Sequence, residues 1–392
     1  MERHASTNVQ PPAPKRQRRD TSLVIYCHDD CARHETTSDG EPEHQESPAR
    51  LAAIAAALQN YDTRRDFAPA DREALLRVHS ARYLDAVSSI DARGRLSPML
   101  RTRVLGESGV DAAAGATPVG PGTWTAATRG AGAALAAVRD ASRGSRAFVL
   151  VRPPGHHAMH EGYDAGAGGC GFCVLGNAAV AAAQALTQAY SNRVAIVDFD
   201  VHHGNGTEDF AVGRRWTHQR LLYASVHLRE VYPENSSLDF FPGTGAAGQH
   251  PSVCNVPVTP NWIEPGARER FVSAVTGAIA DRLAAFRPCL LIISAGFDAL
   301  EGDAGQLNPW TADDPDLPPH VSHEILDGVG LRPEDYGTMT RALLGAIHED
   351  ASVVSILEGG YGRPDGAGGF EKSGLVAAAV AHVEALGSRS RS

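Results

Sequence analysis

Three groups of polar residues, each at the end of an apolar run, carry the side chains best suited to chemistry in this 392-residue sequence. The apolar runs are residues 194–197, 290–293 and 353–357, and the polar residues that follow them are Asp198, Asp200, His202 and Asn205, then Asp298, then Tyr361. Carboxylates, imidazoles and a phenol are groups that bind metal ions and move protons. If these residues converge in the fold, they would form the site of a metal-dependent hydrolase.

The apolar runs that precede these residues are typical of buried strands in a parallel sheet. Further strands are predicted at Leu23–Tyr26, Ala147–Val151 and Leu221–Val226, with helices starting at Ser47–Pro48 as N-cap and first turn, after Gly132, at Asn177–Tyr190 and across Phe271–Phe286. This alternation predicts a single α/β domain whose parallel β-sheet is flanked by helices on both faces. Sites in such sheets form where strands pass into loops, so distant residues would meet in one crevice.

The domain is expected to cover residues 22–386, between a disordered basic tail at 1–21 and a short Ser/Arg tail at 387–392. Residues 303–328 are rich in Pro and Asp without periodicity, which predicts a surface insertion beside the site. Within the first tail, residues 14–19 (PKRQRR) form a compact basic run. It is either a nuclear-import signal or a solvated tail without a specific role, so we expect a nuclear and/or cytoplasmic location.

Composition restricts the class of protein further. A formal net charge of −10 argues against direct nucleic-acid binding by the folded body, which would need a basic face. No apolar stretch reaches the ~18 residues of a membrane span, and the first twenty residues lack the apolar core of a secretory signal. Six cysteines are too few for a disulfide scaffold and fit a reducing cytosolic or nuclear compartment.

Asp200, His202 and Asp298 are the predicted metal ligands. Residues two apart in an extended segment project to the same side, so Asp200 and His202 can hold one ion, with Asp298 arriving from the next sheet position. One imidazole and two carboxylates suit zinc and leave coordination positions for water and substrate. The alternative for Asp-x-His alone is a turn with satisfied polar side chains.

His156 and His157 are the predicted acid/base pair. A base helps to remove a proton from water, and a leaving amine needs a proton, so two imidazoles with different partners fit amide hydrolysis. Asp198 is expected to accept the ring N–H of one and Asn205 to orient the other. The alternative is that the pair, which follows Pro-Pro-Gly, caps a strand.

Tyr361 follows two glycines that free the backbone to present its ring, and its hydroxyl would hydrogen-bond a carbonyl oxygen that gains negative charge. The alternative for this tyrosine is a loop anchor. Cys170-x-x-Cys173 has the spacing of a redox pair, but a role for Phe172 as an apolar wall explains that segment more simply.

Together these residues resemble the histone deacetylase family, in particular its class II branch and bacterial deacetylase-like relatives. The matching strings are residues 152–158 (RPPGHHA), 171–173 (GFC), 198–207 (DFDVHHGNGT), 294–299 (SAGFDA) and 357–361 (LEGGY), with weaker matches at 47–51 (SPARL) and 78–80 (VHS). They cover most of residues 23–361 in the family's order.

The resemblance implies the arginase/deacetylase fold with one zinc ion at the strand ends. It implies that Asp200, His202 and Asp298 are the zinc ligands, that His156 and His157 are the catalytic dyad with Asp198 and Asn205 as partners, and that Tyr361 polarises the carbonyl. It further implies that Phe172, beside Gly171, and Phe241 wall a tunnel for the acyl-lysine chain. Relatives also bind potassium through main-chain oxygens near Asp198, Asp200 and His202 and at the matches to Ser225 and Val226.

The implied activity is that of a zinc-dependent protein-lysine (histone) deacetylase, a chromatin regulator that removes acetyl or another short acyl group from lysine. An acetylpolyamine deacetylase is the alternative within this class, and corepressor partners are not identified by the sequence. A scaffold with a vestigial site is the alternative outside it, but no ligand and no tyrosine is lost. Three rim strings depart from the family: Ala116–Thr117, Val174–Asn177 and Gly302–Gly305.

Overall fold

The structure is a computed structural model that describes residues 23–37, 42–93, 117–141, 146–162, 170–188, 191–213, 216–229, 244–248, 250–306 and 327–388. These ranges leave out the residues before 23 and after 388. They also leave out Phe241 and residues 307–326, which belong to the expected insertion. What the sequence predicts for them therefore stays a prediction.

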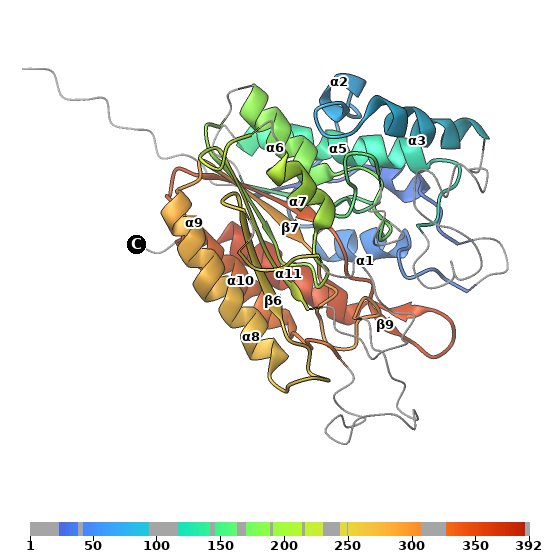
Figure 1. Ribbon diagram of the computed structural model, residues 1–392. Coiled ribbons are helices and arrows are strands. Elements are labelled where there is room, and N and C mark those ends of the chain that lie inside the picture. The colour runs from blue at the N-terminus through green and yellow to red at the C-terminus, as the bar shows by residue number, and fades with distance from the viewer. Residues whose placement is uncertain are drawn as a thin grey trace, which may run out of the picture.

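An eight-stranded sheet forms the centre of the molecule (Figure 1). Its strands are β1 (Leu23–Tyr26), β2 (Asp62–Arg64), β3 (Arg146–Val149), β4 (Val194–Asp198), β5 (Leu221–Leu228), β6 (Val253–Val258), β7 (Leu290–Ala295) and β8 (Ser352–Leu357). The strand order is β2-β1-β3-β8-β7-β4-β5-β6, and every neighbouring pair is parallel. The predicted parallel sheet is confirmed, and β9 (Arg363–Pro364) and β10 (Phe370–Glu371) form a separate antiparallel hairpin.

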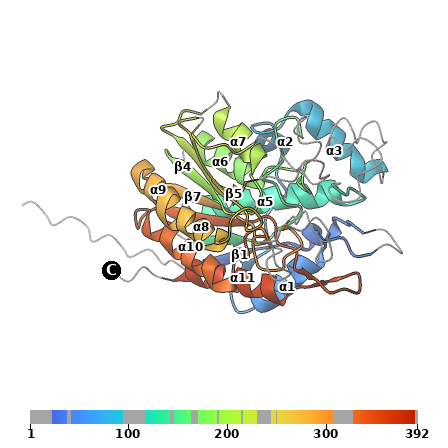
Figure 2. The ribbon, with the colours of Figure 1, turned by 60° about the horizontal axis from the view of Figure 1, so that its bottom comes forward.

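Helices cover both faces of this sheet (Figures 1 and 2). They are η1 (Asp29–Arg33), α1 (Ala49–Ala57), α2 (Arg72–Leu75), α3 (Ala81–Arg93), α5 (Thr123–Ala141), α6 (Asn177–Thr187), α7 (Asn205–Val212), α8 (Ala267–Ala274), the π-helical turn η2 (Val275–Ile279), α9 (Ala280–Phe286), α10 (Pro333–Gly345) and α11 (Ser373–Gly387). Helices α5 and α6 pack together on one face, and α10 packs against α11 on the other. Within the described part of the chain, no helix is both long and apolar enough to cross a bilayer.

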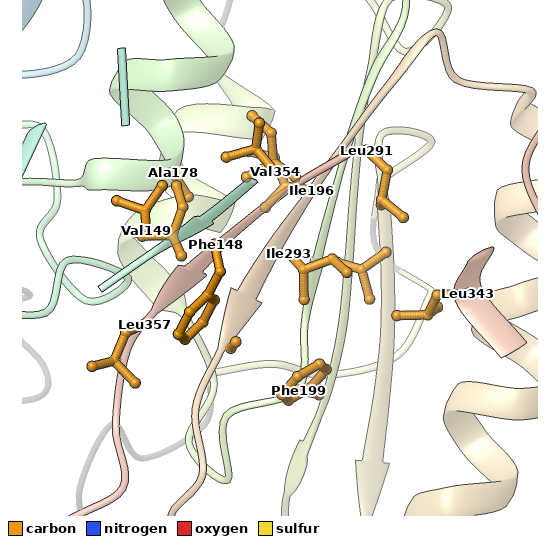
Figure 3. Packing of buried hydrophobic residues seen from close by; sticks show 14 of the residues in the cluster. Phe148, Val149, Ala178, Ile196, Phe199, Leu291, Ile293, Leu343, Val354 and Leu357 are labelled. Atoms are coloured by element: carbon orange, nitrogen blue, oxygen red, sulfur yellow. The ribbon is translucent and has the colours of Figure 1, made fainter. Parts of the chain in front are cut away.

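The central strands are buried along their whole length, because both faces are covered. Figure 3 shows Ala178 of α6 beside Val149 of β3, while Leu343 of α10 lies on the side of Leu291 of β7. Each fully buried Leu, Ile or Val side chain contributes roughly 1.5–3 kcal/mol to folding. This core fixes the positions of the strand ends from which the polar residues project.

Several predicted element boundaries are wrong, for local reasons. Helix α5 begins at Thr123 rather than after Gly132. Gly132 lies inside the helix, where glycine is needed because a Cβ would collide with the Ala68 carbonyl, so it does not mark the helix start. The N-cap of α1 is Pro48, not Ser47, whose hydroxyl instead donates to Glu43 at 2.6 Å. The edge strands β2 and β6 were not predicted: β2 is fully exposed, and β6 has no continuous apolar run.

Candidate active site

The candidate site lies at the carboxyl ends of three neighbouring strands, β8, β7 and β4. Asp198 is the last residue of β4, and Asp200 and His202 follow it in the next turn. Asp298 follows β7, and Tyr361 follows β8. These strands are hydrogen-bonded to one another in register, so residues from three parts of the sequence meet at one edge of the sheet.

The described residues contain one cluster that can hold a metal ion, formed by Asp200, His202 and Asp298, whose ligand atoms all lie within 4.8 Å of one another. His202 Nδ1 lies 3.2 Å from Asp200 Oδ1 and 3.2 Å from Asp298 Oδ2. The second oxygen of each carboxylate accepts a backbone N–H, from Gly359 to Asp200 Oδ2 at 2.9 Å and from Val201 to Asp298 Oδ1 at 2.9 Å. The carboxylates are thus oriented before any ion binds.

This donor set fits zinc. Two carboxylate oxygens and one imidazole nitrogen are borderline-to-hard ligands, and three protein ligands leave room for water and substrate. Both carboxylates are completely buried, a costly arrangement for two acids without a cation between them. Burial followed by the Asp200 charge raises the pKa of Asp298, as expected for a carboxylate beside another acid.

His156 is held by a carboxylate. Its Nδ1 donates to Asp198 Oδ2 at 3.1 Å, and the other oxygen of Asp198 accepts the Asp200 N–H at 3.1 Å. Burial lowers the pKa of His156, but the Asp200 and Asp198 charges outweigh burial and raise it to about 10. The carboxylates therefore stabilise the protonated form of this ring.

His157 is held by an amide instead. Its Nδ1 donates to Asn205 Oδ1 at 2.8 Å, and its ring centroid lies 3.9 Å from that of His156. Burial, followed by the charges of His156 and His202, holds the pKa of His157 well below its usual value. The ring is then neutral, with its lone pair on Nε2. The two imidazoles of one dipeptide thus have opposite protonation preferences, because their partners differ.

Tyr361 and Phe172 face each other across the site, with ring centroids 5.7 Å apart at 90°. Phe172 has a left-handed backbone (φ 65°), and its N–H donates to Thr117 Oγ1 at 3.1 Å. The ring of His44 packs edge-on against Phe172 at 5.0 Å. Gly171 must be glycine, because a Cβ there would overlap the His157 ring. Phe241, the predicted second wall, lies outside the described residues.

A buried ionic network behind the site was not predicted. Glu46 accepts from Arg152 at 2.6 Å and from Arg50 at 2.9 Å, and all three side chains are fully buried. Arg50 also donates to the carbonyls of Glu358, at 2.6 Å, and of Gly360, and its guanidinium lies 4.8 Å above the Tyr361 ring. The string at 47–51 was a weak signal for this network, since it contains Arg50.

A second unpredicted support is Glu358, which the sequence showed only as part of a string. Its Oε2 accepts the N–H groups of Gly155, at 2.7 Å, and of His156, at 3.2 Å, so it fixes the loop that carries the imidazole pair. Burial raises the pKa of this carboxyl to about 7, and the His156 charge opposes that rise.

The two cysteines of the Cys-x-x-Cys segment are both buried and separately engaged. Cys173 Sγ accepts the His157 N–H at 3.4 Å, and Cys170 Sγ donates to the Gly162 carbonyl at 3.3 Å. Burial raises the pKa of Cys173 well above its usual value, which disfavours the thiolate that redox exchange requires. The segment therefore supports the site structurally.

Comparisons with known proteins identify the family of this chain. A family model described as the histone deacetylase domain matches residues 44–372. The histone deacetylase-like amidohydrolase of Pseudomonas aeruginosa is 30% identical over 331 residues, which cover 82% of this chain and 73% of that protein. Acetylpolyamine amidohydrolase 1 of the same organism is 32% identical over 296 residues, which cover 69% of this chain and 80% of that protein.

The crystal structure of the HDA15 HD domain superimposes with a TM-score of 0.68 at 26% identity, covering 95% of this chain and 90% of that one. The family model spans most of the chain, and the parallel sheet with its strand-end site is the arginase/deacetylase fold. The chain therefore belongs to the histone deacetylase family and is a hydrolase of that family.

Proposed function

We propose that this protein catalyses the zinc-dependent hydrolysis of an acetyl or other short acyl amide on a lysine side chain of a histone or other protein, releasing the carboxylate and the free amine. The observation that carries the proposal is the cluster of Asp200, His202 and Asp298 beside the His156–His157 pair. Neither half of this arrangement alone would specify amide hydrolysis, but together they supply a metal site and two proton carriers.

Zinc would be held by Asp200, His202 and Asp298, where it would polarise the amide carbonyl and make water more acidic. The remaining work falls to the side chains. His157, kept neutral with its lone pair on Nε2, accepts the proton that the attacking water loses. His156, whose protonated form the Asp200 and Asp198 carboxylates favour, neutralises developing negative charge and supplies a proton toward the leaving amine.

Tyr361 donates its hydroxyl hydrogen bond to the substrate carbonyl oxygen as negative charge develops there. Burial raises the pKa of this phenol well above its usual value, so it remains a donor. Phe172, perpendicular to Tyr361, provides a flat apolar wall for the methylene chain of the acylated amine.

Hydrolysis of an acetylated polyamine is a second candidate, favoured by the 32% identity to acetylpolyamine amidohydrolase 1 over 80% of that protein. The same catalytic groups serve both substrates, because both present an acylated primary amine on a methylene chain. A substrate panel decides between them: an acetyl-lysine peptide, acetylspermidine and acetylputrescine, each tested with zinc and with a chelator. Higher kcat/KM for the peptide supports the first proposal, and higher kcat/KM for the small amines supports the second.

Two further expectations are proposals as well. We propose that potassium binds through main-chain oxygens near Asp198 and Ser225, supported by the family resemblance, and that the basic run at residues 14–19 directs nuclear import. A rise in melting temperature with potassium but not with sodium would test the first. Imaging a tagged chain with and without residues 1–21 would test the second, and unchanged localisation would contradict it.

A further inference from the structure

Tyr361 sits on a backbone with unusual conformational freedom. Gly360 (φ 102°) and Gly362 (φ 96°) flank it, and both occupy the left-handed region that glycine enters at little cost. A third glycine, Gly359, precedes them. The backbone of residues 359–362 does not by itself fix the position of the Tyr361 hydroxyl, so contacts with neighbouring groups must fix it.

Arg50 holds the Gly360 carbonyl and covers the Tyr361 ring, and Asp303 holds the backbone N–H groups of the segment. Asp303 Oδ2 accepts both the Tyr361 N–H, at 2.9 Å, and the Gly362 N–H, at 2.7 Å. Its Oδ1 accepts the Gly305 N–H at 2.9 Å. The residue is 4% exposed, so water competes little for these bonds. One carboxylate thus joins the tyrosine segment to the segment that follows the metal ligand Asp298.

We propose that Asp303 is a positioning residue for Tyr361, fixing the distance between the phenol and the metal ligands. The inference rests on the proposed function, in which Tyr361 polarises the substrate carbonyl. The sequence alone predicts no such role, because it places Asp303 at the start of an expected surface insertion, 58 positions from Tyr361.

The packing around Asp303 strengthens the inference. On one side, Gly305 lies so close that a Cβ there would be 2.5 Å from Asp298 Cβ and 2.8 Å from Tyr361 Cε2. On another side, Asp303 and Gly362 line a cavity of about 250 Å³, together with Leu300, Glu301 and Arg363. Because Gly305 lies against both the Asp298 and the Tyr361 side chains, a shift of the segment that Asp303 holds would be passed on to the Tyr361 ring.

Asparagine is the sharpest substitution, since it keeps the size of the side chain. All three bonds need an acceptor at Asp303, but an amide offers one acceptor oxygen and one NH2 group. In Asp303→Asn the NH2 group must face at least one N–H donor, so the loop must shift. Zinc content is measured for each variant, because Gly305 also lies against Asp298.

The experiment compares kcat and KM for the zinc-loaded wild type, Asp303→Asn, Tyr361→Phe and the double variant, on whichever substrate the panel selects. We expect Asp303→Asn to lower kcat by about tenfold to a hundredfold, because misplacing a catalytic group by about 1 Å can have such an effect, with KM nearly unchanged. In the Tyr361→Phe background the same change should cost less than twofold. Asp335→Asn is the matched control and should keep wild-type kcat, because this buried carboxylate accepts the Arg332 N–H at the start of α10 and contacts neither Tyr361 nor Gly362 among the described residues.

Equal losses from Asp303→Asn in both backgrounds would overturn the inference, since Asp303 would then not act through Tyr361. So would an unchanged kcat. If Tyr361→Phe itself has wild-type activity, the proposed role of Tyr361 in polarising the carbonyl is refuted. That result is distinguishable from a failure of the Asp303 inference, in which Tyr361→Phe loses activity but Asp303→Asn does not act through Tyr361.

Amide hydrogen exchange tests the inference on the wild-type protein, without any variant that could misfold. The N–H groups of Tyr361 and Gly362 should exchange at least tenfold more slowly than those of Gly366 and Gly368 in the β9–β10 hairpin loop, which donate to no acceptor within the described chain. Equally fast exchange would show that Asp303 does not hold the segment.

Discussion

Asn205 Oδ1 lies 2.8 Å from His157 Nδ1, while Asp198 Oδ2 lies 3.1 Å from the Nδ1 of the adjacent His156. An amide cannot supply the negative charge that a carboxylate does, so the two rings differ in basicity although they share one loop. In the proposed mechanism, Asn205 of α7 and Asp198 of β4 would thereby give the neighbouring imidazoles different proton-transfer roles.

Replacing Asn205 with alanine should therefore lower kcat by about tenfold to a hundredfold, the usual cost of losing a partner that orients a catalytic imidazole. KM should change little, because Asn205 is placed behind the ring and not against substrate. Steady-state kinetics measures both. Asn261→Ala, which removes the acceptor for the N–H groups of Gly266 and Ala267, is the control and should reduce stability without reducing kcat. A fall in KM alone for Asn205→Ala would contradict the assignment.

Gly171→Ala should reduce kcat/KM by about a hundredfold, because the new methyl group would displace the His157 ring. The backbone at residue 171 has φ +48°, so alanine also adds strain of about 1–2 kcal/mol.

Gly248→Ala separates these two effects, since Gly248 has φ +82° but no heavy atom within 4 Å of the position that an added methyl group would take. Gly248→Ala should lose about as much stability as Gly171→Ala but retain wild-type activity. If both variants lose activity equally, strain rather than contact with His157 explains the result.

Zinc should stabilise the folded protein. A ligand that binds only the native state raises the free energy of unfolding, by about 2.7 kcal/mol at a hundredfold excess over its Kd. Adding zinc to chelator-treated protein should therefore raise the melting temperature of the wild type but not of His202→Ala. His203→Gln is the neighbouring control, because His203 Nε2 pairs with Glu208 at 2.8 Å and lies outside the cluster. A zinc shift that survives in His202→Ala would place the metal elsewhere.

His382 should make stability depend on pH below about 6.5. This buried ring bonds Thr340 and Ser355, and burial lowers its pKa to about 3. The unfolded chain binds a proton at this residue below its ordinary pKa of about 6.5, whereas the folded chain does so only near pH 3. Stability is therefore full above pH 6.5 and falls as the pH decreases toward 3, by about 1.4 kcal/mol per pH unit from this group.

Urea unfolding of the wild type and His382→Gln at pH 7 and pH 5 tests the point. The wild type should lose about 2 kcal/mol more than the variant over this interval. His348→Gln, at an exposed histidine, should follow the wild type. Parallel losses in the wild type and His382→Gln would show that His382 does not control this dependence.

The sheet and the metal cluster could be predicted from sequence because both leave local patterns. Val194–Val197 and Leu290–Ile293 are apolar over their full length, as burial on both faces demands, and Asp200 and His202 are separated by a single residue. The helix containing Gly132 was misjudged because glycine there reflects contact with a distant segment, not a helix end.

The supporting groups leave no such pattern. Arg50 contacts the Glu358 carbonyl 308 positions away, and Asp303 contacts residues 58 and 59 positions away. From sequence alone, a charged residue is expected to be exposed to solvent. That it is buried becomes clear only when the structure shows its partners. Sequence therefore predicted the candidate catalytic groups, while the structure was needed to find the groups that hold them in place.

The most direct measurement of the central claim is hydrolysis of an acetyl-lysine peptide and of acetylated polyamines by purified wild type and Asp298→Ala, each with its zinc content determined. Wild type loaded with one zinc per chain should release acetate, and chelation should abolish the reaction until zinc is restored. Asp298→Ala should retain neither the metal nor the activity. Full turnover by folded, zinc-free Asp298→Ala would contradict a metal-dependent amidohydrolase built on Asp200, His202 and Asp298.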